Sequence, residues 1–166
     1  MKILITGPES SGKSTLARRL AIALSGTYVP EFAREYLAER NGEYEREDLV
    51  AILRGQQNLE RAAELSGRSP LVCDTGALVL YVWSQVKYGA AHPLITQAVA
   101  KMDYDHIFLC APDLPWAPDP LREHSDPADR QAIFDRYVAV LEDFGLSYRV
   151  VAGEDRLGGV LRGVGK

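Results

Sequence analysis

A phosphate-binding pattern lies near the start of the chain, where Gly7, Gly12, Lys13 and Ser14 fit the sequence G-x-x-x-x-G-K-[ST]. Glycines at both ends let backbone N–H groups turn toward phosphate oxygens. Lys13 can then reach the β- and γ-phosphates, and the Ser14 hydroxyl can bind Mg²⁺. The alternative is a chance match in a Gly- and Ser-rich loop, which the flanking strand-like and helix-like runs disfavour. The predicted nucleoside triphosphate site comprises Gly7, Glu9, Ser10, Ser11, Gly12, Lys13, Ser14 and Thr15, with Thr15 at the α-phosphate.

Asp74 ends a second strand-like run, at residues 70–74. If this strand neighbours the first one, the Asp74 carboxylate lies across from Ser14, where it can bind Mg²⁺ directly or through water. Asp is also a favoured residue at the start of a helix, and the two roles are compatible. The sequence therefore predicts a Mg²⁺ site made by Ser14 and Asp74.

Glu31 and Arg34 follow the short strand expected within residues 26–30. Ligands of open α/β sheets bind beyond the carboxyl ends of the strands, so Glu31 should lie near the γ-phosphate. Its carboxylate could accept the proton of an attacking hydroxyl, and Arg34 could hold phosphate or substrate. An ordinary solvated helix start, where acidic residues are common, explains the pair equally well.

A segment rich in Pro and charge spans residues 112–126, between a strand and a helix. It could close over the phosphates, with Arg122 and Arg130 neutralising the charge that moves during transfer. A plain surface loop would have the same composition. None of the three histidines has a neighbouring nucleophile of the triad type, and we expect no catalytic role for His92, His106 and His124.

Length and composition exclude several classes of protein. The 166 residues suit one domain with a buried core, and a hydrophobic content of 46% with 25% charged residues is ordinary for a globular protein. The net charge of −4 disfavours sequence-independent binding to nucleic acid. Cys73 and Cys110 lie in apolar runs and are expected to be free thiols. The first strand-like run starts at residue 2 and no apolar run spans a membrane, so we expect no signal peptide and a cytoplasmic location.

Strand and helix patterns alternate along the chain, which predicts an α/β layer fold with a mainly parallel sheet. The expected strands cover residues 2–6, 26–30, 70–74, 106–110 and 148–151. The expected helices cover residues 15–24, 32–40, 46–65, 77–86, 92–102 and 127–144. The helix at 77–86 is almost wholly apolar, so it should be buried against the sheet. Four glycines after residue 157 should weaken any last helix.

Five segments together resemble the kinase domain of NadR-type proteins of NAD salvage, in order and over nearly the whole chain: residues 7–14, 31–36, 55–57, 73–75 and 116–122. That resemblance implies a P-loop NTPase fold with three layers, a five-stranded sheet, helices on both faces and a lid at about residues 113–130. It also implies transfer of the γ-phosphoryl group of ATP, with Mg²⁺, to nicotinamide riboside. Distantly related nucleoside kinases use a glutamate after the second strand as base, which would make Glu31 the base and leave Asp74 for the metal. Together with the roles expected from the residues themselves, the catalytic set is Lys13, Glu31, Arg34, Asp74, Arg122 and Arg130, with Lys13 and the arginines stabilising the phosphoryl in transit.

The chain also departs from that family. It has no H-x-G-H signature, so we expect no adenylyltransferase activity. Pro30 occupies a position where the family is expected to place an aromatic ring that stacks on nicotinamide. The candidates to replace that ring are Tyr28, Tyr36, Trp83 and Tyr88.

Two other functions stay open: a kinase of another nucleoside, nucleotide or vitamin, and a nucleotide-dependent switch with slow hydrolysis. The guanine motif N-K-x-D is missing, but Gln56 and Gln57 could position a water for such a switch. Residues 153–156 could contact the base of the donor nucleotide. The sequence gives no indication of an oligomeric state.

Overall fold

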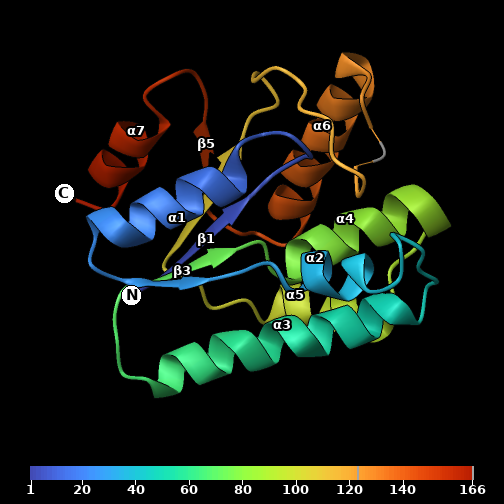
Figure 1. Cartoon of the computed structure of the whole chain (residues 1–166), viewed down its shortest axis with the longest axis horizontal. Helices are drawn as coiled ribbons and strands as arrows, with labels where there is room; N and C mark the ends of the chain where they lie inside the picture. The colour runs from blue at the N-terminus through green and yellow to red at the C-terminus, as the bar shows by residue number, and fades with distance from the viewer. Residues whose placement is uncertain (123, 166) are drawn as a thin grey trace.

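The computed structural model describes residues 1–122 and 124–165, in which five parallel strands form one sheet in the order β2-β3-β1-β4-β5 (Figure 1). All four strand pairs are parallel. This confirms the predicted fold class. The strands are β1 (Lys2–Thr6), β2 (Thr27–Val29), β3 (Leu71–Asp74), β4 (His106–Cys110) and β5 (Arg149–Val151).

Helices cover both faces of the sheet (Figure 1), so the central strands are buried on both sides. In β1, Ile3 and Ile5 pack toward α1 and α7, whereas Leu4 packs toward the other helices. The helices are α1 (Lys13–Ala23), α2 (Phe32–Ala38), α3 (Asp48–Leu65), α4 (Ala77–Tyr88), α5 (Pro93–Ala100), α6 (Pro127–Asp143) and α7 (Arg156–Gly163).

Two glycines shape the loop between β1 and α1. Gly7 has φ 143°, and a Cβ at this position would lie 2.6 Å from the backbone oxygen of Cys110. Gly12 has φ 75° and directly precedes the first residue of α1. Side chains are strained in both conformations, so the loop depends on glycine at these two positions.

Most predicted elements are present, with shifted ends. The helix predicted to end at Arg40 ends at Ala38, and Asn41 and Gly42 follow with positive φ. The apolar helix predicted at 77–86 is α4, which is buried as expected and ends before Gly89 in the left-handed conformation.

The end of the chain is more regular than its glycines suggest. Residues 156–163 form α7, where Val160 is fully buried against the sheet. The Asp155 carboxylate accepts a hydrogen bond from the backbone N–H of Gly158, which caps this helix. A Cβ on Gly163 would lie 3.0 Å from the ring of Phe108, so the small residue lets α7 pack closely against the sheet.

The predicted lid, residues 113–130, divides into two parts. Its described residues before Pro127 contain no helix or strand, and its last four residues are the first turn of α6. Asp126 caps that turn by accepting a hydrogen bond from the backbone N–H of Ala128 at 2.7 Å.

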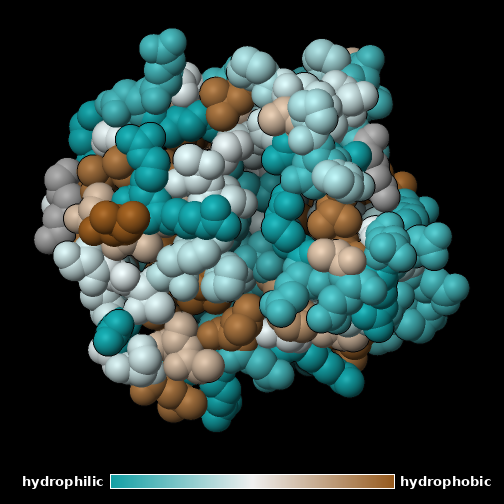
Figure 2. All heavy atoms as spheres, viewed as in Figure 1, coloured by the Kyte–Doolittle hydropathy of each residue, from teal (hydrophilic) through white to brown (hydrophobic). Residues whose placement is uncertain are grey.

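No helix in residues 1–122 and 124–165 is both long and apolar enough to cross a bilayer. Hydrophobic residues on the face in Figure 2 are scattered in small groups among hydrophilic ones. Both cysteines are buried free thiols, as predicted.

Candidate active site

The phosphate loop lies at the carboxyl end of β1, and the following helix begins at Lys13. Within the loop, the Ser11 hydroxyl donates to the backbone oxygen of Pro8 at 2.7 Å, and Lys13 Nζ donates to the same oxygen at 3.2 Å. The loop forms one wall of an open cleft of about 630 Å³. The opposite wall brings in three residues predicted from distant parts of the sequence: Glu31, Arg34 and Arg122.

Asp74 lies beside this cleft because β3 pairs with β1, which places Asp74 level with Ile5. Its carboxylate is 1% exposed. Oδ2 accepts a hydrogen bond from the Tyr28 hydroxyl at 2.9 Å, while Oδ1 has no hydrogen-bond partner among the described residues. Asp74 does not cap the next helix, which begins after Gly76. Its second oxygen is thus buried and uncommitted.

Asp74 and Ser14 line the same opening, of about 610 Å³, next to the phosphate loop. Mg²⁺ prefers oxygen ligands and keeps several waters or phosphate oxygens, so one carboxylate and one hydroxyl suit it. No group of three or more His, Cys, Asp or Glu that could hold a metal occurs in the described chain. The uncommitted Oδ1 of Asp74 therefore fits a Mg²⁺ site shared with a nucleotide.

Tyr28 is the donor that fixes the Asp74 carboxylate. Burial and the neighbouring Asp74 charge raise the pKa of the Tyr28 hydroxyl to about 12. The phenol therefore keeps its proton at neutral pH and continues to donate. The sequence suggested Tyr28 as a stacking ring, whereas the structure uses its hydroxyl.

Glu31 directly precedes α2, yet its side chain makes no capping hydrogen bond in the described structure. The carboxyl instead lines both openings beside the phosphate loop. Burial raises the pKa of Glu31 above its ordinary value; Lys13 opposes this shift and the Asp74 charge adds to it. A carboxyl in this state is closer to a neutral-pH proton acceptor than an exposed one is.

Arg34 and Arg122 approach the same opening from α2 and from the predicted lid. Arg34 forms an ion pair with Asp119 at 2.9 Å, which joins α2 to the lid segment. Arg122 donates to the backbone oxygen of Ala117, and its guanidinium lies 5.8 Å from the ring centre of Trp116. Both cations are thus held beside the cleft by lid residues.

Arg130, the other predicted lid arginine, contacts the backbone of the phosphate loop and of the lid segment. Its side chain is 3% exposed and donates to the backbone oxygens of Ser10, at 3.2 Å, and Leu114, at 3.1 Å. It is not among the residues that line the two openings described above. The structure therefore places Arg130 behind the phosphate loop, between the loop and the lid segment.

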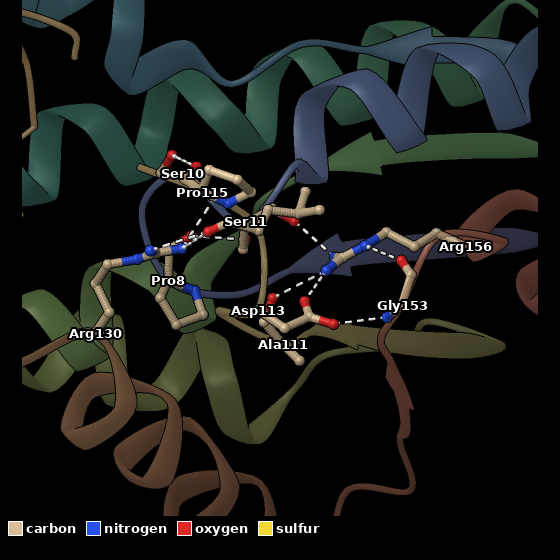
Figure 3. Close-up of polar contacts among 10 residues, drawn as sticks. Pro8, Ser10, Ser11, Ala111, Asp113, Pro115, Arg130, Gly153 and Arg156 are labelled. Atoms are coloured by element: carbon tan, nitrogen blue, oxygen red, sulfur yellow. Dashed lines mark hydrogen bonds and ion pairs between the residues drawn. The ribbon is translucent and has the colours of Figure 1, made fainter. Parts of the chain in front are cut away.

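Arg156, which the sequence suggested only as part of a base-contact loop, holds the phosphate loop from the other side (Figure 3). Its guanidinium donates to the backbone oxygens of Ser11, at 2.8 Å, and Gly153, at 3.1 Å, and pairs with Asp113. Figure 3 shows the loop lying between the two guanidinium groups of Arg130 and Arg156. This role of Arg156 could not be predicted from the sequence, because hydrophobic periodicity does not mark a buried arginine at the start of a helix.

A second cleft, of about 760 Å³, adjoins the first and shares Glu9, Lys13 and Trp83 with it. Its other walls are mostly apolar and include Tyr44. The rings of Tyr44 and Trp83 lie 6.0 Å apart, and Lys87 Nζ lies 3.5 Å from the centre of the Tyr44 ring. An aromatic compartment thus opens directly beside the phosphate loop.

Of the four aromatic candidates, only Trp83 lines this compartment. The hydroxyl of Tyr36 donates to Asp48 at 2.6 Å, and that of Tyr88 donates to the backbone oxygen of Tyr44 at 3.4 Å. Sequence reasoning missed Tyr44, which lies in a charged, irregular segment between two helices. Pro30 lines the opening beside Ser14 instead.

The three histidines lie in different parts of the structure, and one of them is close to the site. His92 Nδ1 accepts the backbone N–H of Leu94 and caps α5. His106 begins β4. The backbone N–H of His124 donates to the Glu9 carboxylate at 3.0 Å, and His124 lines the aromatic cleft, so it lies nearer the site than expected.

Comparison with known sequences confirms the resemblance that the motifs indicated. The trifunctional NAD biosynthesis/regulator protein NadR of Salmonella typhimurium is 27% identical over 166 residues, which cover 96% of this chain and 40% of that protein. The chain thus spans about two fifths of the length of this relative.

Among solved structures, a NadR protein in complex with NR superimposes with a TM-score of 0.77 at 22% identity, over 98% of this chain and 50% of its own. A NadR structure with NAD and AMP-PNP gives 0.78 at 22% identity, over 98% and 48%. Deoxyadenosine kinase from M. mycoides with bound dATP gives 0.62 at 10% identity, over the full length of both chains. At these identities the likeness concerns the fold.

A family model described as an AAA domain matches residues 2–156, which is nearly all of the chain. The match includes the phosphate loop, Asp74 and the segment predicted as a lid. The chain belongs to this AAA domain family.

Proposed function

We propose that the protein is a kinase that transfers the γ-phosphoryl group of ATP to a hydroxyl of a nucleoside, with nicotinamide riboside as the substrate. The observation that carries this proposal is the position of Glu31. Glu31 lines the same cleft as Lys13 and its pKa responds to the Lys13 charge; its side chain makes no helix cap among the described residues, and burial raises its pKa. A proton acceptor placed beside a phosphate loop suits transfer to a hydroxyl.

The donor nucleotide would bind along the phosphate loop. Backbone N–H groups of residues 7–12 would contact its phosphates, Lys13 the β- and γ-phosphates, and Thr15 the α-phosphate. Ser14 and Asp74 would hold Mg²⁺, which neutralises phosphate charge when it is bound. A NadR protein in complex with NAD and AMP-PNP supports nucleotide binding in this fold.

The acceptor would bind in the aromatic compartment, with its ribose hydroxyl turned toward the phosphate loop. Glu31 takes the proton of that hydroxyl, and the oxygen forms a bond to the γ-phosphorus. The bond from the γ-phosphorus to the bridging oxygen breaks, and ADP keeps the electron pair. Arg34 and Arg122 stabilise the negative charge on the oxygens in transit.

The acceptor compartment suits a flat aromatic base. Trp83 offers a ring beside Tyr44, whose own ring is in contact with Lys87, and Glu9 supplies an acidic group at the border with the phosphate loop. The ring of nicotinamide riboside is aromatic and positively charged, and both properties favour such surroundings. A NadR protein in complex with NR supports this class of acceptor.

A nucleotide switch is less well supported. Gln56, a candidate to position water, is 4% exposed, and its amide bonds to the backbone of Phe32 and to Glu60. It does not line the clefts beside the phosphate loop, and Gln57 is exposed on the outer side of α3.

The proposed location is the cytoplasm, because ATP as donor and two free thiols suit a cytoplasmic enzyme.

The test is a panel of nucleosides, including nicotinamide riboside, incubated with the protein and Mg·ATP while ADP and products are followed by mass. We expect nicotinamide mononucleotide and ADP in equal amounts. Slow ADP formation that is equal with every nucleoside and without one would contradict the proposal.

A further inference from the structure

The start of α2, next to Glu31, is held by another helix. The backbone N–H of Phe32 donates to Oε1 of Gln56 at 2.9 Å, and Gln56 lies in α3. The first N–H groups of a helix lack partners within the helix, and Glu31 makes no side-chain cap. Gln56 thus takes the place of a capping side chain, although it belongs to another helix, and it does so at the residue that follows Glu31.

The ring of Phe32 is fixed by the neighbouring residue, Gly55. A Cβ on Gly55 would overlap three carbon atoms of that ring, so the ring lies directly against the helix backbone. Gly55 and Gln56 therefore hold Phe32 at two points, its ring and its N–H. This leaves little freedom for the backbone that bears Glu31.

The orientation of the Gln56 amide is set by Glu60, one turn further along α3. Gln56 Nε2 donates to Glu60 Oε1 at 3.4 Å. The Glu60 carboxylate also accepts from the Tyr104 hydroxyl at 2.9 Å and pairs with Lys2 Nζ at 3.1 Å. A carboxylate beside the amide requires the NH₂ group to face it, and this leaves the amide oxygen to accept from Phe32.

We propose that Gln56 is a positioning residue for Glu31, held in its working orientation by Glu60, Tyr104 and Lys2. The inference rests on the proposed function, in which Glu31 takes the proton of the acceptor. Loss of the hydrogen bond from Phe32 lets the first turn of α2 shift, and Glu31 moves away from the acceptor hydroxyl. A displacement of about 1 Å at a reacting group can reduce turnover by about 100-fold.

The first variant removes the acceptor oxygen at nearly constant side-chain length. In Gln56→Met we expect kcat to fall by about 10- to 100-fold, while the KM for ATP changes by less than about twofold. Gln57→Met is the matched control, because Gln57 is the next residue of α3 and is exposed. The control should leave kcat and the KM for ATP unchanged. Turnover is measured well below the melting temperature of each variant.

A second pair of variants tests the amide orientation. In Gln56→Glu, the new carboxylate faces the Glu60 carboxylate, and we expect kcat to fall at least as far as in Gln56→Met. The double variant Gln56→Glu/Glu60→Gln exchanges the two groups. An amide and a carboxylate then face each other again, with the amide NH₂ as donor and the carboxylate as acceptor. It should recover kcat to within about threefold of the original enzyme.

Hydrogen exchange at the amide of Phe32 provides a readout that does not depend on catalysis. We expect slow exchange in the original protein and in the double variant, and faster exchange in Gln56→Met. If the original protein forms no phosphorylated nucleoside, the proposed function fails. The exchange data would still test whether Gln56 accepts the hydrogen bond from the Phe32 N–H. Unchanged kcat, or equal exchange of the Phe32 amide, in folded Gln56→Met would overturn the inference. If Gln56→Met does not fold, the other pair of variants decides: unchanged kcat in folded Gln56→Glu, or a low kcat that the double variant does not recover, would overturn the inference.

Discussion

The Tyr28 hydroxyl donates to Oδ2 of Asp74 at 2.9 Å, and this contact leaves Oδ1 of the buried carboxylate without a partner among the described residues. Buried polar atoms are normally satisfied, so an uncommitted carboxylate oxygen beside a phosphate loop indicates a site for a cation. Tyr28 holds one oxygen of the carboxylate, and Oδ1 is the oxygen that would bind Mg²⁺ in the proposed function.

The first prediction concerns Mg²⁺. Tyr28→Phe removes the orienting hydrogen bond and should raise the Mg²⁺ concentration needed for half-maximal activity by about 10-fold, as loss of an outer partner of a metal ligand does. Asp74→Asn should reduce activity far more at any Mg²⁺ concentration. Activity is titrated against free Mg²⁺ at saturating ATP. Tyr148→Phe, which removes a hydroxyl near β5, is the control, and equal Mg²⁺ curves for all three variants would contradict the assignment.

The second prediction concerns Glu31. Glu31→Gln should lower kcat by about 100- to 10,000-fold, since it removes the proton acceptor, while ATP still binds. Because the pKa of Glu31 is raised, the acidic limb of kcat/KM in the original enzyme should lie above the pH at which an exposed Glu titrates. A limb at or below pH 4.5, or near-normal kcat in the variant, would count against Glu31 as the base.

The same raised pKa predicts an effect on stability. Between the unfolded and the folded pKa of Glu31, the folded state binds more protons, so this group lowers stability as the pH rises through that window. At neutral pH, Glu31→Gln should therefore melt at a higher temperature than the original protein. The difference should disappear at a pH below the unfolded pKa. A variant that is less stable at both pH values would mean that the carboxylate is a stabilising structural group.

The fourth prediction concerns the acceptor. Trp83→Leu removes a ring face from the aromatic compartment and should raise the KM for the nucleoside by about 10-fold, with a much smaller change in the KM for ATP. Tyr81→Leu is the control, because Tyr81 lies on the same helix and packs its ring edge-on against Phe144. The control should lower the melting temperature without changing the nucleoside KM. An equal rise in both variants would argue against an acceptor site at Trp83.

The fifth prediction concerns Arg156, which contacts the phosphate loop. Arg156→Met removes the donors to Ser11 and Gly153 and leaves Asp113 unpaired, so the loop should lose its fixed shape. We expect ATP binding to weaken by about 10-fold and unfolding to become about 2 kcal/mol easier, as when a buried hydrogen-bond acceptor, here the backbone oxygen of Ser11, loses its donor. Calorimetry measures the first quantity and urea denaturation the second. Arg162→Met, at an exposed ion pair of the same helix, should change neither.

Much of the fold was predictable because it depends on local patterns. Short strand-like runs of four or five residues predicted the strands, and the sequence of the phosphate loop is constrained by its own backbone geometry. Asp74 was predictable because the carboxyl end of a neighbouring strand must lie beside that loop. The ends of α2 and α5 were misplaced by two residues each, since caps depend on single contacts.

The remaining parts of the site depend on contacts between distant segments. Tyr44 lies in an irregular charged segment, and only the packing of that segment against α4 turns it toward Trp83. Arg130 and Arg156 resemble ordinary helix starts in the sequence, yet both contact the phosphate loop more than 100 residues away. Gln56 carried a usable signal: it continues the buried face of α3 after Ile52, where a polar residue is unexpected.

The most direct measurement follows the γ-phosphoryl group itself. The protein is incubated with nicotinamide riboside, Mg²⁺ and ATP whose γ-phosphoryl oxygens are labelled with ¹⁸O, alongside a Lys13→Ala variant. We predict that the label appears in nicotinamide mononucleotide in the same amount as ADP, and that the variant loses this transfer while it remains folded. Label found only in inorganic phosphate, with the nucleoside unchanged, would contradict the proposed function.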